Sequence, residues 1–314
     1  MSRMNAVPND KHSRAAQLPA LRLGDVAGLQ TWWDYRPSEP DLRIRYRRLV
    51  ARFLHEHPRP AWLPIKPVQP HEQWVAYFTF LPNGALSDTH RFTLRHLRDE
   101  GCRLLVICAT PEVSMVPPEL SRYADALYWK GMGGYDFSAY TLALEQIAEH
   151  SAGADVLVLN DSMFGPFHPV LPCLQGARWE LTGLTASSLN ENHLQSYGFA
   201  IRSLDRPRLE QLRGVFFADK AFNHADQVIW VQELLLAREA ARHMSVGAFW
   251  YSDGSSVDDP CLRRPFDLVS AGFPFMKRSL LGKMARFQDP DRVRAFLSAQ
   301  GHPVPPLATQ QSGA

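Results

Sequence analysis

The hydrophobic and polar positions from residue 74 onward alternate between short apolar runs and longer amphipathic segments. WVAYFTF from Trp74 and CRLLVICAT from Cys102 are continuous apolar runs of the length expected for buried strands. Between them, THRFTLRHLRDEG has apolar residues at helical spacing and ends at Gly101. A strand, a helix and a strand in this order predict a right-handed parallel crossover.

The same alternation continues along the chain. Residues 119–128 are predicted to carry a short helix and a strand, and FSAYTLALEQIAEHSAG from Phe137 a helix of about four turns. ADVLVLN from Ala154 is predicted to form another buried strand. This pattern favours an α/β fold, in which ligands bind beyond the carboxyl ends of the strands.

The segments outside this alternation differ in character and suggest four regions. We predict a disordered N-terminus over residues 1–20, a helical accessory segment with a Pro-rich linker over residues 21–73, an α/β domain over residues 74–290, and a C-terminal helix with a disordered tail over residues 291–314. In the accessory segment, DLRIRYRRLVARFLHEH from Asp41 has helical spacing and is rich in arginine. Its basic face is expected either to be solvated or to contact an anionic membrane surface.

Composition narrows the choice of function. The 34 basic and 32 acidic residues leave a formal net charge of +2, which gives no support to nucleic acid as a partner. The four cysteines include no CxxC pair, so a reducing, cytoplasmic setting is expected. No window reaches the roughly 18 apolar residues of a membrane span. The first strand is followed by neither GxGxxG nor a P-loop, which disfavours dinucleotide enzymes and P-loop NTPases.

The run VLVLNDSMFGPF from Val156 ends a predicted strand in three polar residues, Asn160, Asp161 and Ser162. A buried parallel strand that ends in this way delivers the Asp161 carboxylate to the sheet edge where ligands bind. These residue types are also common in turns, so a simple exit from the strand is the alternative.

A second candidate stretch, WKGMGGYDFSAYTLAL, precedes the longest predicted helix. Its glycines, among them Gly134, allow the backbone to approach a ligand closely. Asp136 stands at the expected start of the helix, where it serves either a ligand or the helix N-terminus.

The order of these motifs resembles the rhamnan synthesis protein F family of polysaccharide-assembly glycosyltransferases. The matching pieces are GYDF from Gly134, LNDSMFGP from Leu159, LTGLTASSLNENHLQSYGFAI from Leu181, Glu233 before an apolar helix, and GFPFMKRSLL from Gly272. They lie within residues 74–284. The resemblance implies a GT-A-like nucleotide-sugar-binding sheet flanked by helices, here with an N-terminal helical extension, and transfer of a sugar, often rhamnose from dTDP-rhamnose, to an O-antigen or rhamnan type of glycan.

Such a transferase must neutralise the donor diphosphate. The resemblance places Asp161 where GT-A enzymes hold Mg²⁺ or Mn²⁺, although one carboxylate stands where the usual motif has two. Cationic side chains can do the same without a metal, so metal dependence stays open. The residues expected around the donor are Lys130, Gly134, Asp136, Asn160, Ser162, Lys277 and Arg278.

Inversion at the anomeric carbon also requires a general base for the acceptor hydroxyl. Glu233 in IWVQELLLAREAARHM is the first choice because it is predicted at the opening of an apolar helix, as the base is in inverting GT-A enzymes. Asp136 and Asp226 are the reserves. The alternative for Glu233 is a surface carboxylate in the first helical turn.

His193, Gln195 and Ser196 in NHLQSY are expected to bind sugar hydroxyls or to orient the base. A buried histidine with one partner is the alternative for His193. The acceptor implied by the resemblance is a lipid-linked glycan at the cytoplasmic face of the inner membrane. A hypothesis of another class is a non-catalytic glycan-binding or assembly protein that retains the fold, which the incomplete acidic motif favours.

Overall fold

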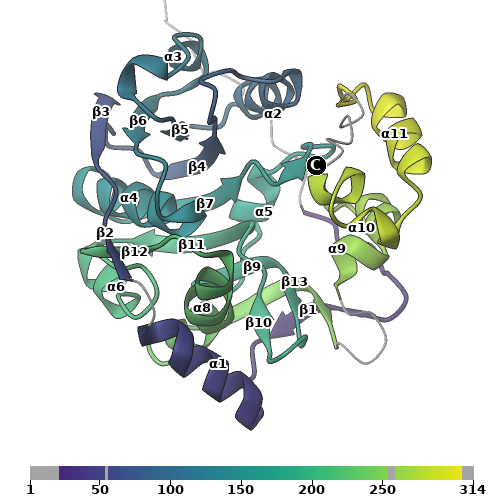
Figure 1. The fold of residues 1–314 in the computed structure, drawn as a ribbon. Coiled ribbons are helices and arrows are strands. Elements are labelled where there is room, and N and C mark those ends of the chain that lie inside the picture. Colours follow the sequence, from purple (N-terminus) through teal and green to yellow (C-terminus); the bar gives the residue numbers. More distant parts are fainter. Residues whose placement is uncertain (1–20, 54–55, 254–258, 306–314) are drawn as a thin grey trace, which may run out of the picture.

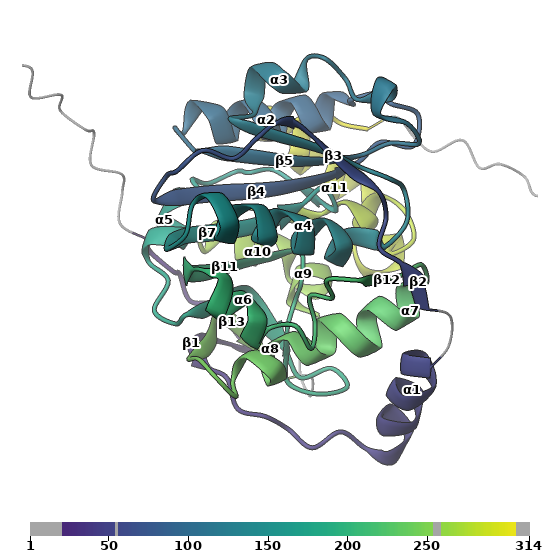
Figure 2. The ribbon, with the colours of Figure 1, turned by 90° about the vertical axis from the view of Figure 1, so that its left-hand side faces the viewer.

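A mixed sheet with helices on both faces forms the centre of the molecule (Figures 1 and 2). The computed structural model describes residues 21–53, 56–253 and 259–305. The N-terminus predicted to be disordered, residues 1–20, and the last residues of the predicted tail, 306–314, lie outside the described residues. The α/β class predicted from the alternation of strands and helices is confirmed.

Within the described part of the chain, ten strands make up this sheet, in the order β1-β13-β9-β11-β7-β4-β5-β6-β3, with β10 paired to β9. The parallel block β7-β4-β5-β6 contains the strands predicted from the apolar runs, so their carboxyl ends lie at one edge. β11 is antiparallel to both of its neighbours. The strands are β1 (Leu29–Asp34), β3 (Trp62–Lys66), β4 (Gln73–Phe80), β5 (Leu104–Ala109), β6 (Ala126–Lys130), β7 (Ala154–Asn160), β9 (Leu181–Ser187), β10 (His193–Leu194), β11 (Gly198–Leu204) and β13 (Val246–Ser252).

The predicted helices after the first strand and before β7 are confirmed as α2 and α4, and the arginine-rich helix as α1. None of the helices in the described ranges is both long and apolar enough to cross a bilayer. The α-helices are α1 (Leu42–Phe53), α2 (Asp88–Asp99), α3 (Leu120–Tyr123), α4 (Tyr135–His150), α5 (Leu171–Gln175), α6 (Arg206–Gln211), α7 (Ala225–Gln227), α8 (Leu234–Ala240), α9 (Pro260–Arg263), α10 (Pro265–Ser270) and α11 (Pro290–Ala299). A π-helical turn spans Val228–Glu233, and 3₁₀ turns span Val113–Met115, Arg278–Leu281 and Ala285–Phe287.

Alternating side chains of the sheet enter two separate hydrophobic cores. On β4, Ala76 and Phe78 pack with α4, α6 and α8, whereas Val75 and Tyr77 pack with α2, α3, α5 and α10. Because both faces are covered, the central strands are apolar without interruption rather than alternating, which is the pattern seen in the sequence.

The segment 21–73, predicted as an accessory, contributes directly to the sheet. β1 pairs antiparallel with β13, and β3 pairs antiparallel with β6, so this segment supplies both edge strands. Trp33 of β1 stacks on Tyr251 of β13 with ring centroids 4.1 Å apart. Within this segment, α1 projects from the body of the molecule (Figure 2). The domain boundaries stay predictions. A boundary at residue 73 would separate the two edge strands, β1 and β3, from the rest of the sheet.

Two small ribbons fasten distant segments to this body. β12 (Lys220–Phe222) pairs with β2 (Glu56–Pro58), and β14 (Met276–Lys277) pairs with β8 (Met163–Phe164). The second ribbon brings the C-terminal part of the chain to the segment that follows β7. It thereby assembles the site described next.

Candidate active site

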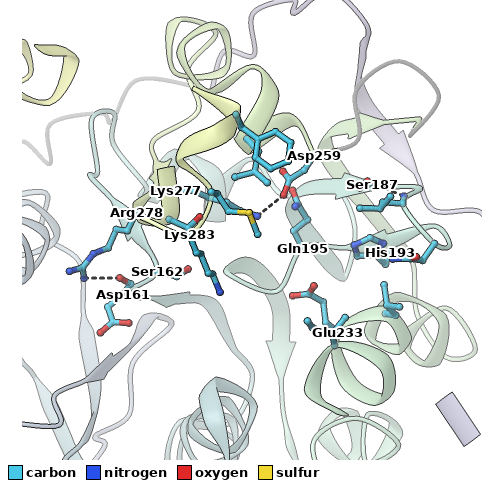
Figure 3. Close-up of a pocket in the computed structure, with 18 of the residues that line it drawn as sticks. Asp161, Ser162, Ser187, His193, Gln195, Glu233, Asp259, Lys277, Arg278 and Lys283 are labelled. Carbon is cyan, nitrogen blue, oxygen red and sulfur yellow. Dashed lines mark hydrogen bonds and ion pairs between the residues drawn. The ribbon is translucent and has the colours of Figure 1, made fainter. Parts of the chain in front are cut away.

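A pocket of about 810 Å³ opens where β7 and β9 end. Asp161 and Ser162, which follow β7, line one part of it, and Glu233 lines another (Figure 3). The two carboxylates singled out from the sequence therefore face the same cavity, although they are far apart along the chain.

Asp161 is held at this edge by donors from neighbouring elements. Its Oδ2 accepts hydrogen bonds from the N–H of Phe80 at 2.8 Å and from the hydroxyl of Thr79 at 3.2 Å, both in the adjacent parallel strand β4. His90 of α2 lies 3.2 Å from the same oxygen through Nε2. The side chain is 17% exposed, so Asp161 is a fixed group with limited access to the pocket.

His90 belongs to this site, although the sequence pattern did not lead to it. The backbone N–H of Ser87 donates to Nδ1 of His90 at 3.1 Å, so Nδ1 acts as an acceptor and the ring proton resides on Nε2. That proton is directed at Asp161. The sequence feature that could have pointed to His90 is the capping box of α2. In this capping box Ser87 is the N-cap and His90 occupies the third helical position.

Arg278 reaches Asp161 because β14 pairs with β8 in a register that sets Lys277 opposite Met163. The Arg278 guanidinium donates to the backbone oxygen of Asp161 at 2.9 Å, and the Arg278 N–H donates to the backbone oxygen of Ser162 at 2.9 Å. Arg278 also lines the larger pocket together with Asp161, and its predicted place at the donor stays a prediction.

Lys277 also lines the pocket, but it has a carboxylate partner. Its Nζ lies 2.6 Å from Oδ2 of Asp259. Burial opposes the charge of Lys277, but the nearby Asp259 carboxylate more than compensates, and the pKa of Lys277 is raised. Asp259 is a further pocket residue that no motif in the sequence pointed to.

Glu233 directly precedes the apolar helix α8, as predicted, but the helical run that contains it begins earlier in the chain. Helical structure begins at Ala225, and Glu233 ends the π-helical turn that joins α7 to α8. π-Helical turns are rare and are often found at functional sites. Oε2 of Glu233 accepts hydrogen bonds from the N–H of Ser196 at 3.3 Å and from the Ser196 hydroxyl.

A second pocket of about 590 Å³ lies beside the first, and Phe80, Asp161 and Ser162 line both. Gly134 contributes to it in a left-handed conformation with φ of 84°. Its N–H donates to Oδ1 of Asn223 at 2.7 Å.

Asp136 lines this second pocket and is tied to its polar wall. Its Oδ2 accepts from the amide of Asn160 at 3.1 Å, and the same amide donates to the hydroxyl of Tyr140 at 2.8 Å. Burial, followed by the negative charge of Glu233, raises the pKa of Asp136 to about 6. The Asn160 oxygen in turn accepts from the N–H and hydroxyl of Ser162, which orders the whole turn after β7.

Lys130 does not belong to either pocket, contrary to its predicted place at the donor. Its side chain is buried, with 2% exposure, and its Nζ donates to the backbone oxygens of Gly131 and Gly133 at 3.0 and 2.6 Å. Burial lowers the pKa of Lys130 to about 7, against the opposite influence of Asp136. The lysine therefore supports the glycine-rich turn from inside.

The three polar residues predicted from NHLQSY lie in different surroundings. His193 and Gln195 are buried and line the larger pocket. Nδ1 of His193 donates to the backbone oxygen of Glu191 at 2.8 Å, and the side-chain oxygen of Gln195 accepts from Thr185. Ser196 lines neither pocket and donates to Glu233 instead. Its predicted role in orienting the base stays a prediction.

The structure thus gathers most of the predicted residues around two adjoining pockets. The larger is lined by Asp161, Ser162, His193, Gln195, Glu233, Lys277 and Arg278, and the smaller by Gly134, Asp136, Asn160, Asp161 and Ser162. The reserve base Asp226 lines a different pocket, beside α1.

Asp161 is a poor match for the metal ion that the resemblance implies. One of its oxygens is already engaged by three groups, and the Arg278 guanidinium contacts its backbone oxygen. Among the residues of the described ranges, no cluster of three or more His, Cys, Asp and Glu side chains is placed to hold a metal ion. Mg²⁺ and Mn²⁺ are hard cations that rely on carboxylate and other oxygen ligands, which this edge of the sheet supplies sparingly.

Comparison with known proteins gives no family assignment. No protein-family model and no curated protein sequence matches the chain, so the resemblance to the rhamnan synthesis protein F family stays a prediction.

The chain is similar over part of its length to solved structures, including the following three. A fragment of S. aureus TarS has 10% identity and a TM-score of 0.36, and the match covers 58% of this chain and 61%, less than two thirds, of that fragment. The inositol-1-phosphate CTP transferase from T. maritima has 9% identity and a TM-score of 0.37, with coverage of 61% and 91%. Glucosyl-3-phosphoglycerate synthase from M. tuberculosis has 14% identity and a TM-score of 0.33, with coverage of 85% and 88%. At such scores these similarities assign neither a family nor an activity to this chain.

Proposed function

We propose that this protein is an inverting glycosyltransferase, which moves a sugar from a nucleotide-sugar donor to a hydroxyl of a growing polysaccharide. The single observation that carries the proposal is that Asp161, at the carboxyl end of a parallel strand, and Glu233, on a helical segment, line one pocket. Parallel sheets bind ligands at this edge. We expect dTDP-rhamnose to be the donor and rhamnose the sugar that is transferred. This expectation rests on the series of motifs that resembles the rhamnan synthesis protein F family.

Glu233 is the proposed general base. Because Ser196 donates to Oε2, the carboxylate is held in one orientation. In the proposed reaction the other oxygen, Oε1, takes the proton from the acceptor hydroxyl, whose oxygen attacks the anomeric carbon from the face opposite the diphosphate. The bond from that carbon to the diphosphate oxygen breaks, and the nucleoside diphosphate leaves with the bonding electrons.

The smaller pocket is the proposed site of the nucleoside. Two aromatic side chains that line it are partly exposed, Phe80 at 44% and Tyr135 at 46%. Aromatic faces of this kind stack on nucleobases. Since Asp161 and Ser162 line both pockets, a donor that crosses this boundary would have its base in one pocket and its sugar in the other.

The acceptor proposed for this enzyme is a lipid-linked glycan, and α1 has the features of a membrane-contacting helix. Leu42, Tyr46 and Leu49 lie at positions i, i+4 and i+7 and are 82%, 67% and 56% exposed. Exposed arginines flank this apolar stripe, including Arg43 and Arg47. An apolar stripe with basic neighbours matches the boundary of an anionic bilayer. α1 also lies at the outer end of the molecule (Figure 1).

The test is turnover by the purified protein. We expect hydrolysis or transfer with at least one nucleotide sugar in a panel that includes dTDP-rhamnose, and loss of turnover in Glu233→Gln with nucleotide binding retained. Asp226→Asn, a carboxylate of the same helical run that lies outside the pocket, is the matched control and should remain active.

Three results would count against this proposal or a part of it. If the protein neither binds nor turns over any nucleotide sugar, the glycosyltransferase proposal is wrong. Full activity of Glu233→Gln would remove the assigned base. Nucleotide or glycan binding without turnover under any condition would instead favour a non-catalytic protein that retains the fold.

A further inference from the structure

The larger pocket is lined by four cationic side chains, Lys277, Arg278, Lys283 and Arg286, counted among the described residues. Two of them are engaged in the structure. Lys277 is paired with Asp259, and Arg278 donates to the backbone oxygen of Asp161. The positive charges of these two groups are thus partly used in holding the walls of the pocket.

Lys283 differs from these two cations. Its side chain is exposed. Its amino group forms no hydrogen bond or ion pair with any residue that the structure describes. Figure 3 shows its side chain extending into the pocket, with the amino group between Ser162 on one side and Glu233 on the other. This is the space between the end of β7 and the proposed base.

An uncompensated ammonium in such a position is suited to a multiply charged anion. Lysine binds phosphate as a mobile point charge, and cations aimed at the place where negative charge develops stabilise a leaving group. Arg286 lies on the same rim, with its guanidinium 5.0 Å from the ring centre of Phe287. Residues 277–286 therefore present positive charge to the pocket from one side.

A divalent cation would meet a less favourable setting. Asp161 already accepts from three groups through one oxygen, and the Arg278 guanidinium contacts its backbone oxygen. A metal ion there would have one carboxylate to offset two positive charges beside a guanidinium. The groups around Asp161 are therefore better suited to an anion that is bound by cationic side chains than to a metal ion.

We infer that Lys283, and not a divalent metal ion, neutralises the diphosphate of the donor and of the departing nucleoside diphosphate, with Arg278 as the second cation. The inference rests on the proposed function and adds to it the residue that contacts the leaving group. In the transfer step Lys283 gains and loses no proton. Its ammonium offsets the charge that accumulates on the diphosphate oxygen as the bond to the sugar breaks.

The experiment compares wild type with Lys283→Met and Lys283→Arg by calorimetric titration of dTDP and UDP, each with and without EDTA, and by donor hydrolysis. Lys220→Met, a lysine of β12 outside the pocket, is the matched control. We expect Lys283→Met to weaken nucleoside diphosphate binding about tenfold or more while binding of the nucleoside monophosphate changes little. Lys283→Arg should restore most of the affinity, and EDTA should leave wild type unchanged.

The outcomes separate this inference from the proposed function. If wild type binds dTDP or UDP and hydrolyses a donor, but EDTA abolishes both and Lys283→Met behaves as wild type, the inference is overturned and the transferase proposal stands. If wild type binds no nucleoside diphosphate at all, both are overturned. Because Lys283 is exposed, thermal unfolding of Lys283→Met should match wild type, which checks that any loss of binding does not come from misfolding.

Discussion

Ser196 donates two hydrogen bonds to Glu233, one from its backbone N–H at 3.3 Å and one from its hydroxyl, and both end on Oε2. The carboxylate is held by a residue 37 positions earlier in the chain, in the turn that precedes β11. A base that is fixed through one oxygen presents the other in a defined direction, which is how a positioned general base works.

Ser196→Ala is therefore expected to lower kcat while KM for the donor changes little. The hydroxyl contact is lost, the backbone N–H contact remains, and we expect a decrease of about tenfold, the scale of one charge-assisted hydrogen bond. Steady-state kinetics with the donor identified in the screen is the measurement. Adding Ser196→Ala to Glu233→Gln should cause little further loss, because the two residues act as one unit. Additive losses would show that Ser196 acts elsewhere.

Gly134 should not tolerate a side chain. Its φ is 84°, and an added Cβ would lie 2.5 Å from the hydroxyl of Ser138. We expect Gly134→Ala to lower the free energy of unfolding by about 1–3 kcal/mol, measured by urea denaturation, and to weaken nucleotide binding in the smaller pocket. Gly153 is the matched control, because it has φ of 86° and an added Cβ there would meet nothing within 4 Å. Equal losses in Gly134→Ala and Gly153→Ala would mean that the close approach to Ser138 is unimportant.

Lys130 should give the protein a measurable dependence of stability on pH. Burial lowers the pKa of Lys130 from 10.5 to about 7, so between these values the unfolded chain binds a proton that the folded protein has released. More protons on the unfolded state mean that stability rises with pH over this range. Relative to Lys130→Met, the free energy of unfolding of wild type should rise from pH 7 to pH 9 with a slope of at most about 1.4 kcal/mol per pH unit. Parallel profiles in urea denaturation would rule this out.

The stripe on α1 should bind anionic lipid. Replacing Leu42, Tyr46 and Leu49 by serine should reduce co-sedimentation with phosphatidylglycerol vesicles while leaving turnover of a soluble acceptor intact, because these side chains are exposed and lie outside both candidate pockets. Binding of wild type should weaken in high salt, since arginines contribute the electrostatic part. Leu63→Ser, at 48% exposure on β3, is the control. Equal sedimentation of the control and the triple variant would exclude α1 as the contact.

The local pattern of the sequence was sufficient for the elements that form the centre of the sheet. Continuous apolar runs predicted β4, β5 and β7, and helical periodicity predicted α2 and α4, because burial on both faces or on one stripe leaves a direct record in the order of residues. The position of Asp161 followed from the same logic, since a parallel strand that ends in a carboxylate must present it at the ligand-binding edge.

Contacts between distant segments were decided only in the tertiary structure. Lys130 and Lys277 are both lysines beside apolar residues, yet one is buried under a glycine turn and the other is paired with Asp259 in the pocket. The pairing of β14 with β8 brings Arg278 to Asp161, and the C-terminal segment adds Lys283 to the same cavity. Periodicity records whether a side chain faces apolar surroundings or water, but it carries no information on which strand lies next to which. That choice depends on the packing of the whole sheet, and it determines which charges come to share one pocket.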